Sequence, residues 1–125
     1  MPTSTAIPAA QALLLQTLVT PTAQGIASRV LVTTTDGRVT LFAFDAGQGL
    51  TEHTSPFDAL VLVLEGALSL TVGGVSVSAT PGSVVRLPAD VAHAVEAQVP
   101  TKTRSTRKRT SYTKNPPQGA RSSVG

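Results

Sequence analysis

The stretch that decides the fold spans residues 47–66 and reads Gly47-Gln-Gly-Leu-Thr-Glu-His53-Thr-Ser55-Pro-Phe-Asp-Ala59-Leu-Val-Leu-Val-Leu-Glu-Gly66. A glycine stands at each end, a histidine interrupts the first half, and residues 59–64 are apolar without a break. A short, uninterrupted apolar run is typical of a strand that is covered on both faces. The stretch therefore predicts a buried strand, with a histidine on the segment that leads into it.

The sequence on both sides of this stretch alternates between apolar and polar residues. Residues 30–44 and 68–79 each contain two such runs, joined by an Asp-Gly pair in the first range and a Gly-Gly pair in the second. A two-residue turn of this kind between alternating runs predicts a β-hairpin. Shorter runs follow at 83–87 and 91–95. Many short strands and no long helix predict an all-β fold, either a sandwich or a barrel.

A second patterned block carries the other histidine of the chain. It reads Gly82-Ser-Val-Val-Arg-Leu-Pro88-Ala-Asp90-Val-Ala-His93. The chain of 125 residues has two histidines and no cysteine. Its length suits a single domain, and the lack of cysteine excludes disulfides, thiolate metal sites and a cysteine nucleophile. His53 and His93 are therefore the main candidates for metal binding or proton transfer.

Charge divides the chain at about residue 100. Residues 1–100 hold all seven acidic residues and three arginines, a net charge of 3 − 7 = −4, whereas residues 101–125 hold seven basic residues and no acidic one, a net charge of +7. Because this basic segment has almost no large apolar side chain, we expect residues 99–125 to form a disordered tail. Its scarcity of aromatic residues and its lack of a folded platform argue against nucleic-acid binding.

The N-terminal segment is apolar but short. Residues 1–28 carry no charged side chain, and the apolar stretch 12–19 is far below the ~20 residues that cross a bilayer. A signal peptide would begin with a basic region, which is missing here. The sequence thus predicts a cytoplasmic protein without a membrane span. We expect residues 1–24 to form a short helix or strand that packs on the core.

The two patterned blocks resemble the motifs of the cupin superfamily, in particular the small single-domain bacterial cupins with a conserved type 2 barrel. The first motif of that family is G-x5-H-x-H-x3,4-E-x6-G and the second is G-x5-P-x-G-x2-H-x3-N. Six positions match at the family spacing: Gly47, His53, Gly66, Gly82, Pro88 and His93. The resemblance covers about residues 29–97. It implies an antiparallel double-stranded β-helix, or jelly-roll barrel, over residues 25–98.

The chain departs from the family at positions that carry chemistry. In cupins the two histidines and the glutamate of the first motif, with the histidine of the second, hold a divalent metal. Ser55 stands at the place of the second histidine and Ala59 at that of the glutamate. Asp58 is one residue out of register and should point to the other face. The resemblance therefore implies at most a weak site for Mn, Fe, Zn or Ni, held by His53 and His93.

A second departure concerns the end of the barrel. Small cupins continue past the histidine of the second motif into a final hydrophobic strand, but this chain becomes basic and polar from Thr101. We therefore expect the last strand to be missing. One hypothesis is that residues from about 101 onward are the product of a frameshift. A barrel without this strand would keep an unpaired edge, which favours association.

Three functions remain open at this point. The leading hypothesis is a cupin that binds a small molecule in a pocket lined by His53, Ser55 and His93, with at most a weak metal site. The alternative is a metal-dependent cupin enzyme of the isomerase or dioxygenase type, with the two histidines as ligands. The third is an interaction module without a pocket. Catalysis by a Ser55–His53 pair lacks a third member, and the sequence leaves enzymatic activity open. The resemblance also implies a homodimer.

Overall fold

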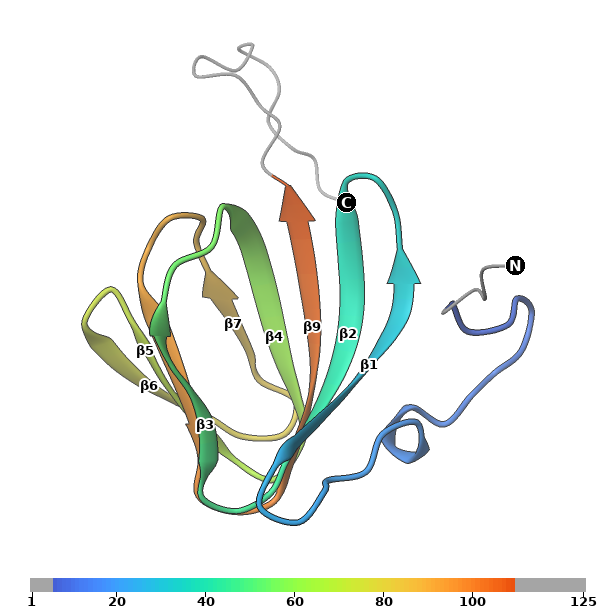
Figure 1. The fold of residues 1–125 in the computed structure, drawn as a ribbon, viewed down its shortest axis with the longest axis horizontal. Coiled ribbons are helices and arrows are strands. Elements are labelled where there is room, and N and C mark those ends of the chain that lie inside the picture. Colours follow the sequence, from blue (N-terminus) through green and yellow to red (C-terminus); the bar gives the residue numbers. More distant parts are fainter. Residues whose placement is uncertain (1–5, 110–125) are drawn as a thin grey trace, which may run out of the picture.

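The computed structural model describes residues 6–109 and shows an antiparallel β-barrel built from two facing sheets (Figure 1). A single turn of 3-10 helix, η1 (Leu15–Thr17), precedes the strands. The strands are β1 (Ile26–Thr33), β2 (Gly37–Phe44), β3 (Gln48–His53), β4 (Phe57–Glu65), β5 (Leu68–Val72), β6 (Val75–Ala79), β7 (Val84–Leu87), β8 (His93–Ala97) and β9 (Thr101–Arg109). The prediction of an all-β jelly roll is confirmed.

The two sheets divide the motif blocks between them. The order in the larger sheet is β1-β2-β9-β4-β7, and that in the smaller sheet is β3-β8-β5-β6. Strand β3 carries the first histidine and pairs with β8, which carries the second. Strand β4 holds the apolar run and lies inside the larger sheet, between β9 and β7. The predicted strand is therefore an interior strand of the sheet opposite the histidines, but the prediction that both of its faces are covered is wrong, because Leu60 on its outer face is 45% exposed.

Strand β9 corrects the prediction about the end of the chain. It lies in the middle of the larger sheet, paired with β2 on one side and β4 on the other. The expected end of the barrel at residue 98, the missing last strand and the disorder of residues 101–109 are therefore wrong. The frameshift hypothesis loses its support in this segment, because these residues complete the barrel. The rest of the expected tail, residues 110–125, lies outside the described part of the chain.

A polar sequence forms this central strand because the inward residues of its first half, Thr101 and Thr103, are small and β-branched. Thr101 and Thr103 are 0% and 1% exposed. The hydroxyl of Thr101 lies 2.7 Å from the carbonyl oxygen of Val99 and 2.9 Å from that of Ala67, and it accepts a hydrogen bond of 3.2 Å from the Ala67 amide. A buried hydroxyl that is hydrogen-bonded in this way costs little. Two neighbouring strands also satisfy the backbone of β9 on both edges.

The core has two layers. The larger cluster lies between the sheets and is built from aliphatic residues around one phenylalanine: Phe44, Val61, Val63, Leu68, Leu70, Ala79, Leu87, Val95 and Ala97. The smaller cluster lies on the outer face of the larger sheet, beneath the N-terminal segment: Val19, Leu31, Leu41 and Ala43. Burial of apolar surface in these two layers is the main favourable contribution to folding.

The N-terminal segment runs along the outside of the barrel beside β1 (Figure 1). Its apolar residues Ile7, Leu15 and Leu18 pack against the outer cluster. Lys102 of β9 donates a hydrogen bond of 2.8 Å to the carbonyl oxygen of Gln16, which ties the segment to the centre of the sheet. Within residues 6–109, no helix has the length and apolar character needed to cross a membrane.

Candidate ligand pocket

A cavity of about 580 Å³ lies between the two sheets. Its volume falls in the range of pockets that bind small molecules. The three residues predicted to line a pocket, His53, Ser55 and His93, all line this cavity. The sheet register brings them together, because the ends of β3 and β8 meet at the same point of the smaller sheet. The structure thus places the predicted pocket residues around one space.

The two imidazoles are direct neighbours. His53 and His93 face each other in the pairing of β3 with β8. Their ring centroids are 4.4 Å apart, and the ring planes meet at 68° in an edge-to-face arrangement. His53 is exposed, whereas His93 is 7% exposed. The pair therefore reaches from the buried interior to solvent.

The backbone fixes the tautomer of both rings. The Nδ1 atom of His53 lies 2.7 Å from the carbonyl oxygen of Thr51, and that of His93 lies 3.2 Å from the carbonyl oxygen of Val91. A carbonyl oxygen only accepts, so each Nδ1 carries the proton and donates it. In a neutral imidazole the lone pair then lies on Nε2. Each ring therefore offers one nitrogen to a hydrogen-bond donor or a metal ion.

Ser55 links the two motif blocks. Its hydroxyl oxygen accepts a hydrogen bond of 3.2 Å from the Phe57 amide, and its carbonyl oxygen accepts one of 2.7 Å from the Asp90 amide. Among residues 6–109, no hydrogen bond joins the Ser55 hydroxyl to either histidine. This geometry gives no support to a serine nucleophile activated by His53.

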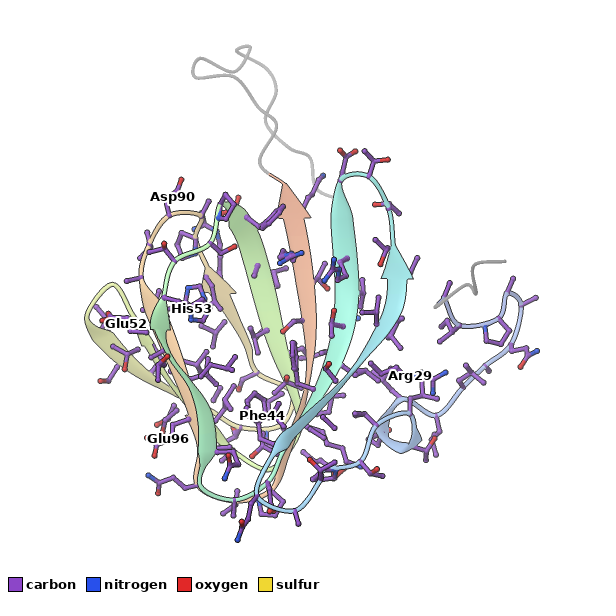
Figure 2. The ribbon with its side chains drawn as sticks, viewed as in Figure 1. Arg29, Phe44, Glu52, His53, Asp90 and Glu96 are labelled. Carbon is purple, nitrogen blue, oxygen red and sulfur yellow. The ribbon has the colours of Figure 1, made fainter. Side chains whose placement is uncertain are left out.

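The position of the family glutamate faces the cavity but carries no ligand atom. Ala59 lines the cavity. The neighbouring Asp58 points away from it, because its carboxylate accepts a hydrogen bond of 2.9 Å from the Ala89 amide and lies 3.9 Å from the guanidinium of Arg86. Glu52, one residue before His53, also points away from the barrel (Figure 2). Within the described residues, no three His, Asp or Glu side chains come close enough to hold a metal ion.

The cavity also contains two arginines that the sequence did not reveal. Arg38 of β2 and Arg107 of β9 line it, and the two residues are direct partners in the sheet. The guanidinium of Arg107 lies 4.2 Å from the centroid of the Phe57 ring. Burial lowers the pKa of Arg107, and the charge of Arg38 lowers it further. Small and basic residues alternate only over residues 101–105, so the sequence carried no signal for Arg107 on the cavity wall.

The matches to known proteins agree with this architecture. A family model described as a cupin domain matches residues 40–104, more than half of the chain. The chain belongs to the cupin superfamily. No curated protein is similar to it.

Solved structures of other cupins share the fold. A conserved protein of unknown function from Streptococcus pyogenes is 29% identical, with a TM-score of 0.78 over 83% of this chain and 91% of that one. A cupin superfamily protein from Desulfitobacterium hafniense is 23% identical, with the same TM-score over 83% and 95%. KdgF from Halomonas is 23% identical, with a TM-score of 0.65 over 69% and 80%. Identities this low for the last two establish the fold alone.

The metal site of the cupin motifs does not fit the residues of this cupin. Two of the four ligand positions hold Ser55 and Ala59, and the structure places no other carboxylate or imidazole in the cavity wall that residues 6–109 form. Divalent transition metals are held tightly by several preorganised donors, and two imidazoles supply only part of such a set. The site is therefore better described as a pocket that contains a histidine pair.

Proposed function

We propose that this cupin binds a small organic molecule in the cavity between its sheets. The observation that carries the proposal is the histidine pair at the edge of a cavity of about 580 Å³. Pockets for small molecules combine a largely apolar wall with a few convergent polar groups. Here the polar groups include His53, Ser55 and His93, and side chains of the inner core form the apolar part.

The chemistry of the pair supports binding through hydrogen bonds. Both Nε2 atoms accept when the rings are neutral, so a hydroxyl or amide group of a ligand would find two acceptors side by side. The buried ring of His93 adds to this, because a hydrogen bond formed away from water is worth more than an exposed one. The pair therefore orients a polar group of the ligand.

A variant that fills the cavity tests the proposal. Ala59→Phe places a ring in the cavity, whereas the matched variant Leu60→Phe places the same ring on the opposite face of β4, where the side chain is 45% exposed. Ligands from a library of small molecules, detected by NMR, should lose binding to the first variant and keep it in the second. Equal binding to both variants would contradict the proposal.

Any divalent metal in this pocket is weakly held in our proposal. Elemental analysis of the purified protein should find less than one metal ion per chain, and dialysis against a chelator should leave ligand binding intact. The competing function, a metal-dependent enzyme of the isomerase or dioxygenase type, predicts stoichiometric metal that disappears in both His53→Ala and His93→Ala. That result would overturn our proposal.

We also propose, from the resemblance to other cupins, that the protein is a cytoplasmic homodimer. Light scattering on the purified full-length chain measures the mass directly. A mass of twice 12.8 kDa is expected. A mass of one chain at all concentrations would refute the dimer.

A further inference from the structure

The wall of the cavity opposite the histidines is positively charged. Arg38 and Arg107 are direct partners between β2 and β9, and Arg107 is in turn the direct partner of Ala59 on β4. These three residues form one row across the larger sheet, and all three line the cavity. The glutamate position of the family motif is therefore occupied by alanine directly beside an arginine. The row carries two positive charges and no negative one.

Within residues 6–109, neither Arg38 nor Arg107 forms an ion pair with a carboxylate, and the ion pairs Arg86–Asp58 and Lys102–Glu65 do not involve the cavity. The remaining residues, 1–5 and 110–125, contain no Asp or Glu. The face of the Phe57 ring, 4.2 Å from the guanidinium of Arg107, is the nearest compensation, and a ring face attracts a cation only weakly.

The folded cavity disfavours the charge that it contains. Burial, followed by the charge of Arg38, lowers the pKa of Arg107, which means that the protonated form is less favourable here than in water. An arginine nevertheless stays protonated at neutral pH. An anion between the two guanidinium groups would reverse the repulsion and replace the lost solvation, because guanidinium groups bind oxyanions through paired hydrogen bonds.

The rest of the lining indicates an anion with an organic body. Apolar side chains from both sheets contribute to the cavity, including Phe44, Val61 and Leu87. The cavity of about 580 Å³ is far larger than an inorganic ion needs. A molecule that combines one acidic group with an apolar or hydroxylated body would use both parts.

We propose that the ligand of this pocket is a small organic acid, whose carboxylate or phosphate group binds between Arg38 and Arg107. Its body extends across the apolar lining toward the histidine pair. This inference rests on the proposed function and deepens it, because it names the chemical class of the ligand. Arg38 and Arg107 select ligands that carry an acidic group, and the histidine pair orients the opposite end of the molecule.

Three probes with the same ring test the inference: benzoate, phenyl phosphate and neutral benzamide. Calorimetric titration of the full-length protein should give at least one acid an affinity about tenfold or more above that of benzamide. Whichever of the two acids binds more tightly distinguishes a carboxylate from a phosphate ligand. Arg107→Gln should abolish this preference. The matched variant Lys108→Gln removes the same charge from the next residue of β9, which is exposed and does not line the cavity, and should retain it.

The outcomes separate the two proposals. Equal binding of benzamide and both acids would overturn the inference and leave the proposed function in place, whereas binding of none of the three would count against both. An equal loss of acid binding in Arg107→Gln and Lys108→Gln would also overturn the inference, since it would show attraction to overall charge. If Arg107→Gln does not fold, as judged by circular dichroism, Arg38→Gln on the neighbouring strand gives the same readout.

Discussion

The cavity is bounded by two walls of unlike character, a histidine wall on β3 and β8 and an arginine wall on β2 and β9. In the histidine wall the Nδ1 atom of His53 donates to the Thr51 carbonyl of β3, and that of His93 donates to the Val91 carbonyl just before β8, so both Nε2 atoms can accept when the rings are neutral. In the arginine wall two like charges lie side by side without a carboxylate partner within residues 6–109. The backbone holds both imidazoles in place without a ligand. The two guanidinium groups, in contrast, would be stabilised by a bound negative charge. In this cupin the motif locates the pocket, and residues outside the motif determine what it selects.

The largest effect should follow from removal of β9, the strand that carries Arg107 of the arginine wall. Truncation after Pro100 deletes β9 and leaves β2 and β4 without their shared neighbour. Because this strand supplies backbone hydrogen bonds on both sides and buries Thr101 and Thr103, we expect loss of cooperative folding. Thermal unfolding followed by circular dichroism measures this. Truncation after Arg109 keeps every described strand and is the control. A cooperative transition in the first truncation would contradict the structure.

A smaller but still large effect should separate two glycines of the first motif. Gly66 (φ 89°) follows β4 of the larger sheet. A Cβ there would collide with the carbonyl oxygen of Pro100 and lie 2.7 Å from the Cα of Thr101. Gly47 (φ 83°) precedes β3, and a Cβ there would meet nothing within 4 Å. We expect Gly66→Ala to cost about 3 kcal/mol of unfolding free energy and Gly47→Ala about 1 kcal/mol. Urea unfolding checks both values, and equal costs would show that the left-handed backbone alone explains the motif glycines.

The two walls should interact when the family ligands are restored. Ser55→His with Ala59→Glu returns four ligand side chains to the cavity, but the new carboxylate would lie beside Arg107. We expect about tenfold tighter zinc binding in this double variant, and about tenfold more when Arg107→Gln is added, because the guanidinium competes for the carboxylate. Calorimetric zinc titration measures both steps.

The control for zinc binding is Ser55→His with Leu60→Glu, which places the carboxylate on the outer face of β4. It should remain close to the wild type. If the triple variant binds zinc no more tightly than the double variant, the charge of Arg107 does not affect a carboxylate at position 59. The pairing of Arg107 with position 59 then has no electrostatic consequence.

The histidine wall was predictable from the sequence, and the arginine wall was not. The resemblance of the two motif blocks around His53 and His93 to cupins implied both the barrel and the proximity of the histidines, and the period of two correctly placed Asp58 outside. The arginine wall depends on the register of β9, whose residues are Thr, Ser, Arg and Lys. Composition alone predicts disorder for such a segment, because it carries no apolar face. Only the folded structure supplies the reason: two flanking strands satisfy its backbone, Thr101 and Thr103 fit buried sites, and the hydroxyl of Thr101 is hydrogen-bonded there.

The smallest effect should come from position 90, before β8, where Asp90 replaces the glycine of the second motif. Asp90 stands at a motif glycine and adopts a left-handed φ of 65°, while its amide donates the hydrogen bond to Ser55 that links the two blocks. Asp tolerates this conformation better than most residues, and glycine adopts it freely. We therefore expect Asp90→Gly to raise the unfolding free energy by about 0.5 kcal/mol and Asp90→Ala to lower it by about 1 kcal/mol, both measured by urea unfolding. A large loss in Asp90→Gly would mean that the carboxylate itself supports the histidine wall. The expected pair of values would instead show that position 90 requires only a backbone conformation.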